Sequence, residues 1–336
     1  MGRSLIEVVA YSLSFSPQFV AECAGSSPWS RSFYRRVSIP KKNKPNERRI
    51  IYLPSPEIKL MQHFLVERYI SKLPVHGSAT AYRRGSSVVK NAKAHTGNSH
   101  FLLMDIESFF DSIQRGRVKR MLLNNGVFVN PADAEMLISL CTYDGHFVQG
   151  CVSSPSVANA YLYEFDNKMD MLARGLPNGV YTRYSDDIVL SSSERIPGQI
   201  AAEVAAALAE FGLRINHKKT HFISNRQRIH ITGIRLKDNK KLGLNTLFKK
   251  ELKNDVYQFW KKCSLSGADL KDKNRLYGKL AYLKMADPSY YNTIITKYRF
   301  GCRTLLDFLH CLVLENDHLM LPPDKRFTDC SSNRIE

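Results

Sequence analysis

The sequence predicts an α+β fold on three observations. Residues 31–54 contain two strand-forming stretches separated by the turn-forming tripeptide Lys-Pro-Asn. The apolar run that begins at Phe101 and the segment 181–192, YTRYSDDIVLSS, have the composition of further strands. Elsewhere apolar residues recur at helical spacing, and helical segments dominate from Asn245 onward. This change of pattern places a domain boundary near residue 240.

The remaining elements follow in chain order. Residues 1–30 are expected to form a helix and then a Ser/Pro/Gly-rich loop. A second helix is expected over 56–73, where apolar residues lie three and four positions apart. The polar tail after about residue 320 is expected to be loose. The other predicted elements are helices over 117–124, 131–141, 154–173 and 199–211, and short strands over 213–236.

Charge and cysteine content restrict the class of partner and the compartment. The 336-residue chain has a net charge of +18, which predicts a polyanionic partner, either nucleic acid or an anionic membrane surface. No stretch approaches the ~20 apolar residues of a membrane span, and no signal peptide is expected. The seven cysteines are scattered without any C-x-x-C pair, which argues against a disulfide framework or a cysteine zinc site. A reducing cytoplasm is therefore expected.

Two adjacent aspartates, Asp186 and Asp187, stand between the two strand-like halves of residues 181–192. A solvated turn would explain the dipeptide taken alone, since aspartate is common in turns. A divalent cation site would also explain it, because Mg²⁺ is held by one or two carboxylates plus substrate phosphates. A third carboxylate, Asp105, follows the apolar run at 101–104 and so stands at the end of a buried strand. Such a set suits two metals that clamp a phosphoryl transfer.

Five segments, in this order, resemble the motifs of a reverse transcriptase. The match runs over residues ~35 to ~236. The segments are IPKKNKPNERRIIYLPSPEIKLMQ for the fingers region, FLLMDIESFFDSI for motif A, QGCVSSPSVANAYLYEFD for motif B, YSDD for motif C and GLRINHKKTHF for motif D.

Two further segments resemble signatures of bacterial retron reverse transcriptases. One is the N-A-x-x-H element with Asn91 and His95, and the other is the x-T-G element with Thr232 and Gly233. The chain departs from the usual pattern with Ser185 where alanine is commoner, with QGCVSSP in motif B and with isoleucine before Thr232. A group II intron-like or defence-associated reverse transcriptase stays open, as does an RNA-binding scaffold that holds an effector.

The resemblance implies a right-hand polymerase with an antiparallel palm sheet backed by helices. It implies RNA-templated DNA synthesis with two Mg²⁺ ions. The implied parts are an N-terminal helical extension (1–30), fingers with part of the palm (31–100), palm (101–240), a basic helical thumb (241–320) and a C-terminal tail (321–336).

Catalytic roles carry over residue by residue. Asp105 and Asp186 would hold both metals, Asp187 would complete the cluster, and the backbone carbonyl of Ile106 would face a metal. Lys219 would donate a proton to the leaving pyrophosphate, and the adjacent Lys218 is an alternative for that role.

Substrate-binding roles carry over in the same way. Phe110 would be the steric gate that rejects a ribose 2′-OH, with core packing as the alternative explanation. Arg49, with Arg48 or Lys41 beside it, would hold the triphosphate. Gln149 would lie near the incoming nucleotide, and Gly150 would allow close backbone approach.

The resemblance also implies partners. Asn91 and His95 would contact RNA or organise an insertion, and Thr232 and Gly233 would lie near the primer strand. The template would be a cognate structured non-coding RNA, primed from a 2′-OH of one of its guanosines, and the product a DNA joined to that RNA. Such systems act in anti-phage defence with a separate effector protein, and no membrane partner is expected.

Overall fold

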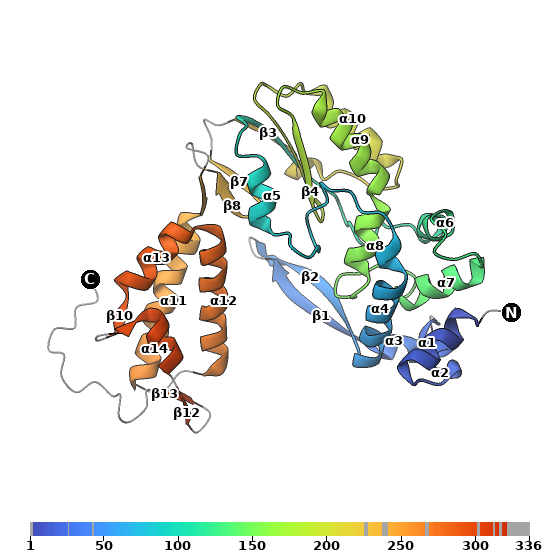
Figure 1. Ribbon diagram of the computed structural model, residues 1–336, viewed down its shortest axis with the longest axis horizontal. Helices are drawn as coiled ribbons and strands as arrows, with labels where there is room; N and C mark the ends of the chain where they lie inside the picture. The colour runs from blue at the N-terminus through green and yellow to red at the C-terminus, as the bar shows by residue number, and fades with distance from the viewer. Residues whose placement is uncertain are drawn as a thin grey trace. The chain divides into compact units, whose positions relative to one another are not determined.

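The computed structural model describes residues 3–25, 27–41, 44–224, 228–236, 241–265, 269–300, 303–311, 313–315 and 318–320. The chain divides into two compact units, Met1–Asn225 and Arg226–Glu336 (Figure 1). This division falls earlier than the predicted boundary near residue 240, because the short strands over 229–244 pair with one another and contact a helix of the second unit. The predicted tail over 321–336 lies outside the described residues.

Serine followed by proline begins several helices of the first unit. The side chains of Ser16, Ser27 and Ser55 each accept a hydrogen bond from a backbone amide of the first turn, and proline follows each of them. Residues 1–30 therefore contain several short helices rather than one helix and a loop. The helices are α1 (Leu5–Leu13), α2 (Pro17–Cys23), α3 (Pro28–Ser32) and α4 (Pro56–Arg68), with the short 3₁₀ helix η1 (Ile70–Lys72) after α4.

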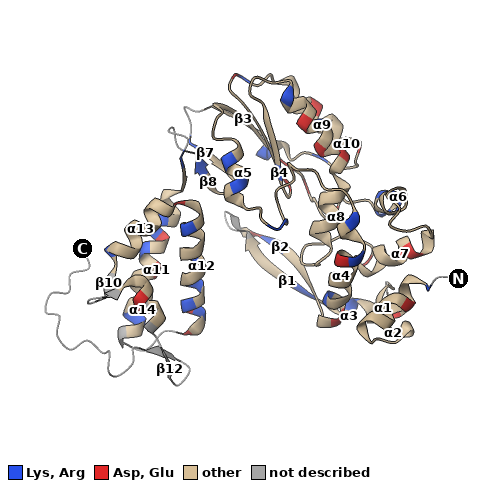
Figure 2. Ribbon diagram, viewed as in Figure 1, with Lys and Arg blue, Asp and Glu red and all other residues tan. Residues whose placement is uncertain are grey.

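The basic stretch after α3 forms the predicted antiparallel hairpin of β1 (Tyr34–Lys41) and β2 (Lys44–Pro54). The tripeptide Lys-Pro-Asn, which is predicted to form the turn, instead lies at the start of β2, where the register shifts opposite Pro40 and Lys41. Its register pairs Val37 with Ile51 and Ile39 with Arg49. Lysine and arginine residues occur along both strands, as Figure 2 shows.

A four-stranded antiparallel sheet lies at the centre of the first unit. Its spatial order is β4-β5-β3-β6, with strands β3 (His100–Asp105), β4 (Val180–Tyr184), β5 (Asp187–Ser192) and β6 (His221–Ser224). The strand after the apolar run and the two strands around the aspartate pair are thus neighbours. The sequence predicted each strand, and the antiparallel pairing within an α+β fold is confirmed.

Helices cover this sheet and the loops beside it. Helix α9 packs on β4 and β5, α10 packs on α9, and α5 contacts β4. The helix predicted over 154–173 is two helices, because Leu162 leaves helical geometry with φ −97° and ψ 14°. The helices are α5 (Val88–Ala94), α6 (Arg115–Asn124), α7 (Pro131–Leu140), α8 (Ser154–Tyr161), α9 (Tyr163–Arg174), α10 (Gln199–Ala209) and the short 3₁₀ helix η2 (His217–Lys219).

The second unit is mostly helical and basic, as predicted. In α12 the buried side chains Leu276, Leu280 and Leu283 lie at helical spacing. Lysines and arginines recur along the same helix (Figure 2), and Lys271, Arg275 and Lys284 are exposed. Its helices are α11 (Thr246–Leu265), α12 (Leu270–Ala286), α13 (Pro288–Lys297) and α14 (Leu305–Cys311). Its strands are β7 (Ile229–Ile231), β8 (Ile234–Leu236), β9 (Leu242–Leu244), β10 (Arg299–Phe300), β11 (Arg303–Thr304), β12 (Val313–Glu315) and β13 (His318–Met320).

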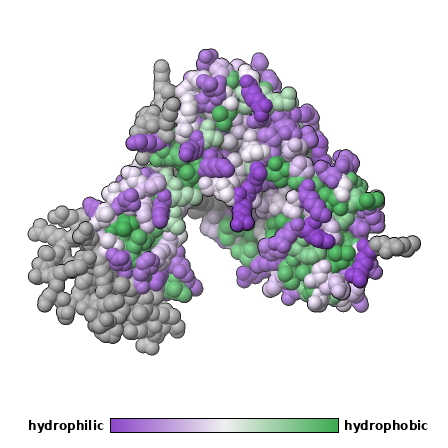
Figure 3. Space-filling model, in the orientation of Figure 1, coloured by the Kyte–Doolittle hydropathy of each residue, from purple (hydrophilic) through white to green (hydrophobic). Residues whose placement is uncertain are grey.

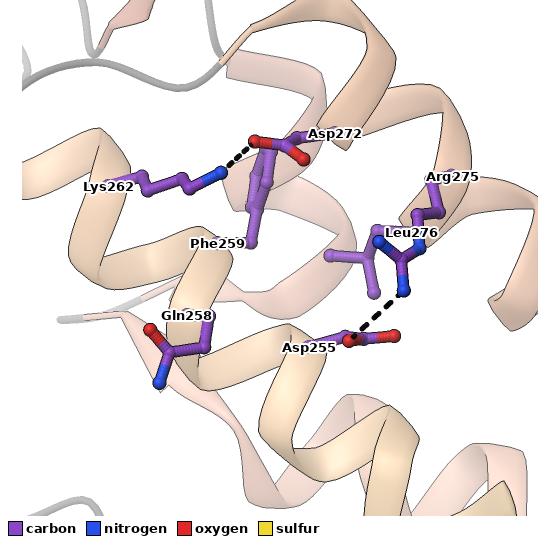
Figure 4. A pocket seen from close by; sticks show the side chains of 7 residues that line it. All are labelled: Asp255, Gln258, Phe259, Lys262, Asp272, Arg275 and Leu276. Atoms are coloured by element: carbon purple, nitrogen blue, oxygen red, sulfur yellow. Dashed lines mark hydrogen bonds and ion pairs between the residues drawn. The ribbon is translucent and has the colours of Figure 1, made fainter.

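A cleft of about 280 Å³ lies between α11 and α12 and is lined by charged side chains (Figure 4). Lys262 pairs with Asp272 at 2.5 Å, and Asp255 pairs with Arg275 at 3.9 Å. The carboxylates of this cleft therefore have cationic partners already, and none of the predicted site residues lines it.

The hydropathy of the surface and of the described helices bears on possible contact with a membrane. On the face of the first unit drawn in Figure 3, hydrophilic and hydrophobic residues are interspersed. Within the described residues, no helix combines the length and the apolar character that crossing a bilayer requires. Cys23, Cys141 and Cys151 are buried free thiols, and Cys263 is buried as well.

Candidate active site

Three aspartates meet at one end of the central sheet. Asp105 is the last residue of β3 and pairs in register with Asp187, the first residue of β5. Asp186 lies in the tight turn between β4 and β5, next to Ser185, whose φ is +63°. Asp105 is only 7% exposed. The topology thus brings together carboxylates that are more than 80 positions apart in the sequence.

Backbone hydrogen bonds fix the positions of these aspartates. The amide of Ile106 donates to the carbonyl oxygen of Asp186 at 2.9 Å, and the amide of Asn216 donates to the carbonyl oxygen of Asp105 at 2.8 Å. Ile106, whose carbonyl is predicted to face a metal, directly follows the last residue of β3, and its amide is turned to the aspartate turn. The backbone therefore holds the three carboxylates near one another before any ligand binds.

Mutual repulsion and burial disfavour the charged form of two of these groups. Burial raises the pKa of Asp186, and the charge of Asp105 raises it further. The pKa of Asp187 is raised to about 7 by burial first and then by the charges of Asp186 and Asp105. A cation beside them would lower both pKa values and relieve the repulsion.

Lys219 supplies one positive charge to the cluster. Its Nζ lies 2.6 Å from Oδ2 of Asp105, and the lysine side chain is 60% exposed. Burial alone would lower the pKa of Lys219, but the hydrogen bond to Asp105 and the charges of the three aspartates raise it overall. Both candidate lysines are exposed, and Lys219 forms an ion pair with Asp105 of this cluster.

The carboxylates of this site suit an Mg²⁺ ion whose coordination is shared with a bound substrate. They do not form a site in which the protein supplies every ligand. Within the described residues, no three His, Cys, Asp or Glu groups are placed to hold one ion by themselves. Mg²⁺ does not require this, because it keeps several waters and is usually bound by one or two carboxylates together with substrate phosphates. The aspartates at the ends of β3 and β5 supply such carboxylates.

Phe110 is largely buried. It is 8% exposed and packs against Phe109 with ring centroids 5.3 Å apart. The ring therefore contributes to the core, and a small part of its surface remains accessible. Both explanations given for Phe110 from the sequence are compatible with this placement.

Gly150 has a structural requirement that the sequence did not reveal. Its φ is +108°, and a Cβ at this position would lie 2.1 Å from the carbonyl oxygen of Tyr52. The preceding residue, Gln149, accepts a hydrogen bond at 2.8 Å from the amide of Tyr52 through its backbone carbonyl. The backbone neighbour of Gly150 in the structure is strand β2, and its predicted role beside the nucleotide stays a prediction.

The two arginines of β2 have different surroundings. The guanidinium of Arg48 donates to the hydroxyl of Ser38 at 2.7 Å and to its carbonyl at 2.8 Å. Burial raises the pKa of Tyr82, and the charge of Arg49 is near enough to oppose that shift slightly. The Tyr82 hydroxyl lies 2.9 Å from the hydroxyl of Ser185, which precedes the aspartate pair. The side chain of Lys41 lies outside what the structure describes.

The predicted RNA contact of Asn91 and His95 stays a prediction, and the side chains of both residues are buried in this structure. Both have no exposed surface. The His95 ring nitrogens lie 2.7 Å from the hydroxyls of Thr182 on β4 and Ser191 on β5, and burial lowers its pKa to about 3. Thr80 donates its hydroxyl to Asn91 at 2.8 Å. The N-A-x-x-H element thus fastens α5 and the loop before it to the aspartate hairpin, which fits the alternative that it organises an insertion.

Thr232 and Gly233 form the two-residue turn between β7 and β8. Their φ values are +47° and +84°, and the flanking Ile231 and Ile234 pair across the hairpin. Positive φ at both positions is the geometry of a type I′ turn, which suits glycine and strains a β-branched threonine.

Three residues that hold the aspartate turn, either directly or through a neighbour, were not singled out from the sequence: Tyr82, Asp166 and Arg183. Tyr82 is 53% exposed and is linked to the aspartate turn through Ser185. Arg183 and Asp166 form an ion pair with no exposed surface. The available signal was a charged residue within the alternation of a buried strand, since Arg183 stands between Thr182 and Tyr184.

The pattern of the reverse transcriptase (RNA-dependent DNA polymerase) family matches residues 39–236, more than half of the chain, and the protein belongs to this family. Within the family, the predicted resemblance to retron reverse transcriptases is confirmed. The retron Ec83 reverse transcriptase of Escherichia coli is 29% identical, over 79% of this chain and 86% of the relative. The retron Ec73 enzyme of the same species is 29% identical, over 79% and 88%. The retron Ec86 enzyme is 27% identical, over 78% and 79%.

Among solved structures, telomerase from Candida albicans in complex with a fragment of telomeric RNA aligns with 85% of this chain and 59% of its own. The TM-score is 0.44 and the identity is 13%, a similarity too low to support an argument.

Proposed function

We propose that this reverse transcriptase copies part of a cognate structured RNA into single-stranded DNA at the site formed by Asp105, Asp186 and Asp187. The observation that supports this most directly is the convergence of these carboxylates at the paired ends of β3 and β5, with Lys219 beside them. Burial and mutual repulsion raise the pKa values of two of the three, as expected for a site that functions with cations bound.

Two Mg²⁺ ions would be held by Asp105 and Asp186, with Asp187 and the Ile106 carbonyl completing the set. When bound, they supply charge neutralisation and in-line positioning of the phosphates. The side chain of Lys219 holds a proton at Nζ within reach of Asp105, and we assign it the protonation of the leaving pyrophosphate.

The nucleotide would be bound by residues around the aspartates. Arg49 binds the triphosphate through its guanidinium. Gln149, fixed to β2 through its backbone, lies beside the nucleotide. Phe110 excludes a ribose 2′-OH with the part of its ring that remains accessible.

The chain would work as a right-hand polymerase. We assign the fingers to residues 31–100, the palm to the central sheet and the thumb to the basic helices of the second unit. The turn of Thr232 and Gly233 would lie near the primer strand. Basic and aromatic side chains of α11 to α13 would bind phosphates and unpaired bases of the RNA.

The similarity to retron enzymes extends the proposal to partners. The template would be a non-coding RNA encoded beside the enzyme, and synthesis would start from a 2′-OH within that RNA. The product would remain joined to it. The complex would hold a separate effector in check in the cytoplasm as part of anti-phage defence. A reverse transcriptase that uses another template is the alternative, as is a scaffold whose polymerisation is secondary.

Nucleic acid that copurifies with the protein tests this function. The protein is expressed with its flanking DNA, and the bound nucleic acid is treated separately with RNase and DNase. A variant with both Asp186→Asn and Asp187→Asn serves as the comparison. A short single-stranded DNA joined to RNA, absent from the variant, is expected. Bound RNA without DNA in either sample would contradict the polymerase proposal and favour the scaffold.

A further inference from the structure

Arg183 is a fully buried arginine on β4, the outer strand of the central sheet next to β5. It lies two residues before Ser185, and its side chain has no exposed surface. Burial of a charge is costly unless the charge is paired and its hydrogen-bonding groups are satisfied. A buried arginine beside a candidate active site therefore needs a physical explanation.

One side of the guanidinium is neutralised by a single carboxylate. Nε donates to Oδ1 of Asp166 at 2.8 Å, and the terminal NH2 nitrogen donates to Oδ2 at 2.6 Å. The hydroxyl of Tyr181 also donates to Oδ1 of Asp166, at 2.6 Å. This bidentate pair fixes the plane of the guanidinium. Because Asp166 balances its charge, Arg183 has little charge left to offset that of the aspartate cluster.

The other side of the guanidinium points to the aspartate turn. The NH1 nitrogen of Arg183 donates to the backbone carbonyl of Ser185 at 3.1 Å. Ser185 has a φ of +63°, a conformation that costs free energy for a residue other than glycine and persists only when its surroundings impose it. The carbonyl that Arg183 binds belongs to the peptide that joins Ser185 to Asp186.

Asp186 is therefore held on both sides. The peptide before it is bound by Arg183, and the peptide after it is bound by the amide of Ile106 at 2.9 Å. The backbone of Arg183 is anchored as well, since its amide donates to the Ser78 carbonyl at 2.8 Å and its carbonyl accepts from the Thr80 amide at 2.8 Å.

We propose that Arg183, held in place by Asp166, is a positioning residue that fixes the strained turn at Ser185 and so orients the Asp186 carboxylate for metal binding. The inference rests on the proposed role of Asp186. It goes beyond that role because it assigns a purpose to a buried ion pair that touches neither substrate nor metal. A pair that only stabilised the fold could be replaced by apolar side chains without loss of function.

The test uses two variants of the full-length chain. Arg183→Lys keeps the charge that pairs with Asp166 but lacks the planar fork that binds Ser185 at the same time. A double variant, Arg183→Leu with Asp166→Leu, removes both charges together, so no unpaired charge is left buried. The readouts are Mn²⁺ binding by electron paramagnetic resonance, the kcat and KM for dNTP, and thermal unfolding.

Both variants are expected to unfold cooperatively and to bind Mn²⁺ about 10–100-fold more weakly than the parent, the usual cost of losing a group that orients a metal ligand. The kcat should fall more than the KM for dNTP changes. Tyr161→Phe is the matched control, since it removes another buried hydrogen bond of the same unit, from Tyr161 to the Phe211 carbonyl at 2.6 Å. It should lower stability and leave Mn²⁺ affinity unchanged.

Folded variants that bind Mn²⁺ and polymerise like the parent would overturn the inference. An equal loss of Mn²⁺ affinity in Tyr161→Phe would also overturn it, because the effect would then follow stability alone. If the parent binds Mn²⁺ in a way that depends on Arg183 but incorporates no dNTP, the proposed function fails and the positioning role stands.

Discussion

Replacing Asp187 with asparagine should stabilise the metal-free protein at pH 8. The pKa of Asp187 is raised from 3.8 to about 7, mainly by burial and then by Asp186 and Asp105. At about 1.36 kcal/mol per unit, this shift corresponds to an upper limit of about 4 kcal/mol. Asp187 is partly exposed, so solvent screening reduces the expected effect to about 1–2 kcal/mol. The asparagine side chain carries no charge and is free of this cost.

The pH dependence of this effect has a definite sign. Between about pH 4 and pH 7 the folded protein keeps a proton on Asp187 that the unfolded chain has already lost. The contribution of this group to the free energy of unfolding is therefore highest at acidic pH and falls as the pH rises through about 7. The stability difference between the variant and the parent should be near zero at pH 4 and reach its full value at pH 8.

Thermal or urea unfolding in EDTA from pH 4.5 to pH 8.5 measures this difference. The variant should unfold a few degrees higher than the parent at pH 8. Addition of Mg²⁺ should reverse the order, because only the parent retains all three carboxylates. A parent that equals or exceeds the variant in stability at pH 8 without metal would refute the assignment of a repulsive carboxylate cluster.

Three further substitutions have distinct expected outcomes. Phe110→Ala should allow incorporation of rNTPs. The control Phe109→Ala should lose a similar amount of folding free energy, roughly 3–5 kcal/mol, and should still reject rNTPs. Equal dNTP selectivity of the two variants in single-nucleotide extension would contradict the steric-gate assignment. Gly150→Ala should lower the urea midpoint and nearly abolish dNTP incorporation, because its Cβ would lie 2.1 Å from the Tyr52 carbonyl oxygen, and an unchanged midpoint would show that the approach is not tight. Thr232→Asn should raise the Tm, because asparagine adopts a positive φ at a free-energy cost about 1 kcal/mol lower than threonine. The same substitution should weaken RNA binding in a filter assay, since the threonine is proposed to lie near the primer strand. An unchanged Tm would argue against strain in the turn.

The sequence was informative where structure depends on local patterns. The hairpin over residues 34–54, the strand that ends at Asp105 and the turn at Asp186 all follow from alternation, apolar runs and turn-forming residues. Motif order then predicted which aspartates would meet, and the central sheet brings them to one end.

Contacts between distant residues could not be predicted in this way. His95 is hydrogen-bonded to side chains 87 and 96 positions away, so its spacing from Asn91 along a helix did not reveal that both are buried. The ion pair of Arg183 with Asp166 joins a strand to the helix that packs on it, and neither element identifies its partner by itself. Residues 154–173 have the composition of one helix, and nothing in that pattern marked the interruption at Leu162, where the backbone leaves helical geometry.

Single-nucleotide extension by the parent and by Asp186→Asn tests the central claim most directly. The assay uses a primed RNA template, one complementary dNTP and Mg²⁺, with RNA affinity measured in parallel. The parent should add the nucleotide, and the variant should lose about 10²–10³-fold or more in rate while binding RNA equally well, because only a carboxylate at the reacting phosphate is removed. Undiminished extension by the folded variant would contradict the assignment of this aspartate cluster as the polymerase active site.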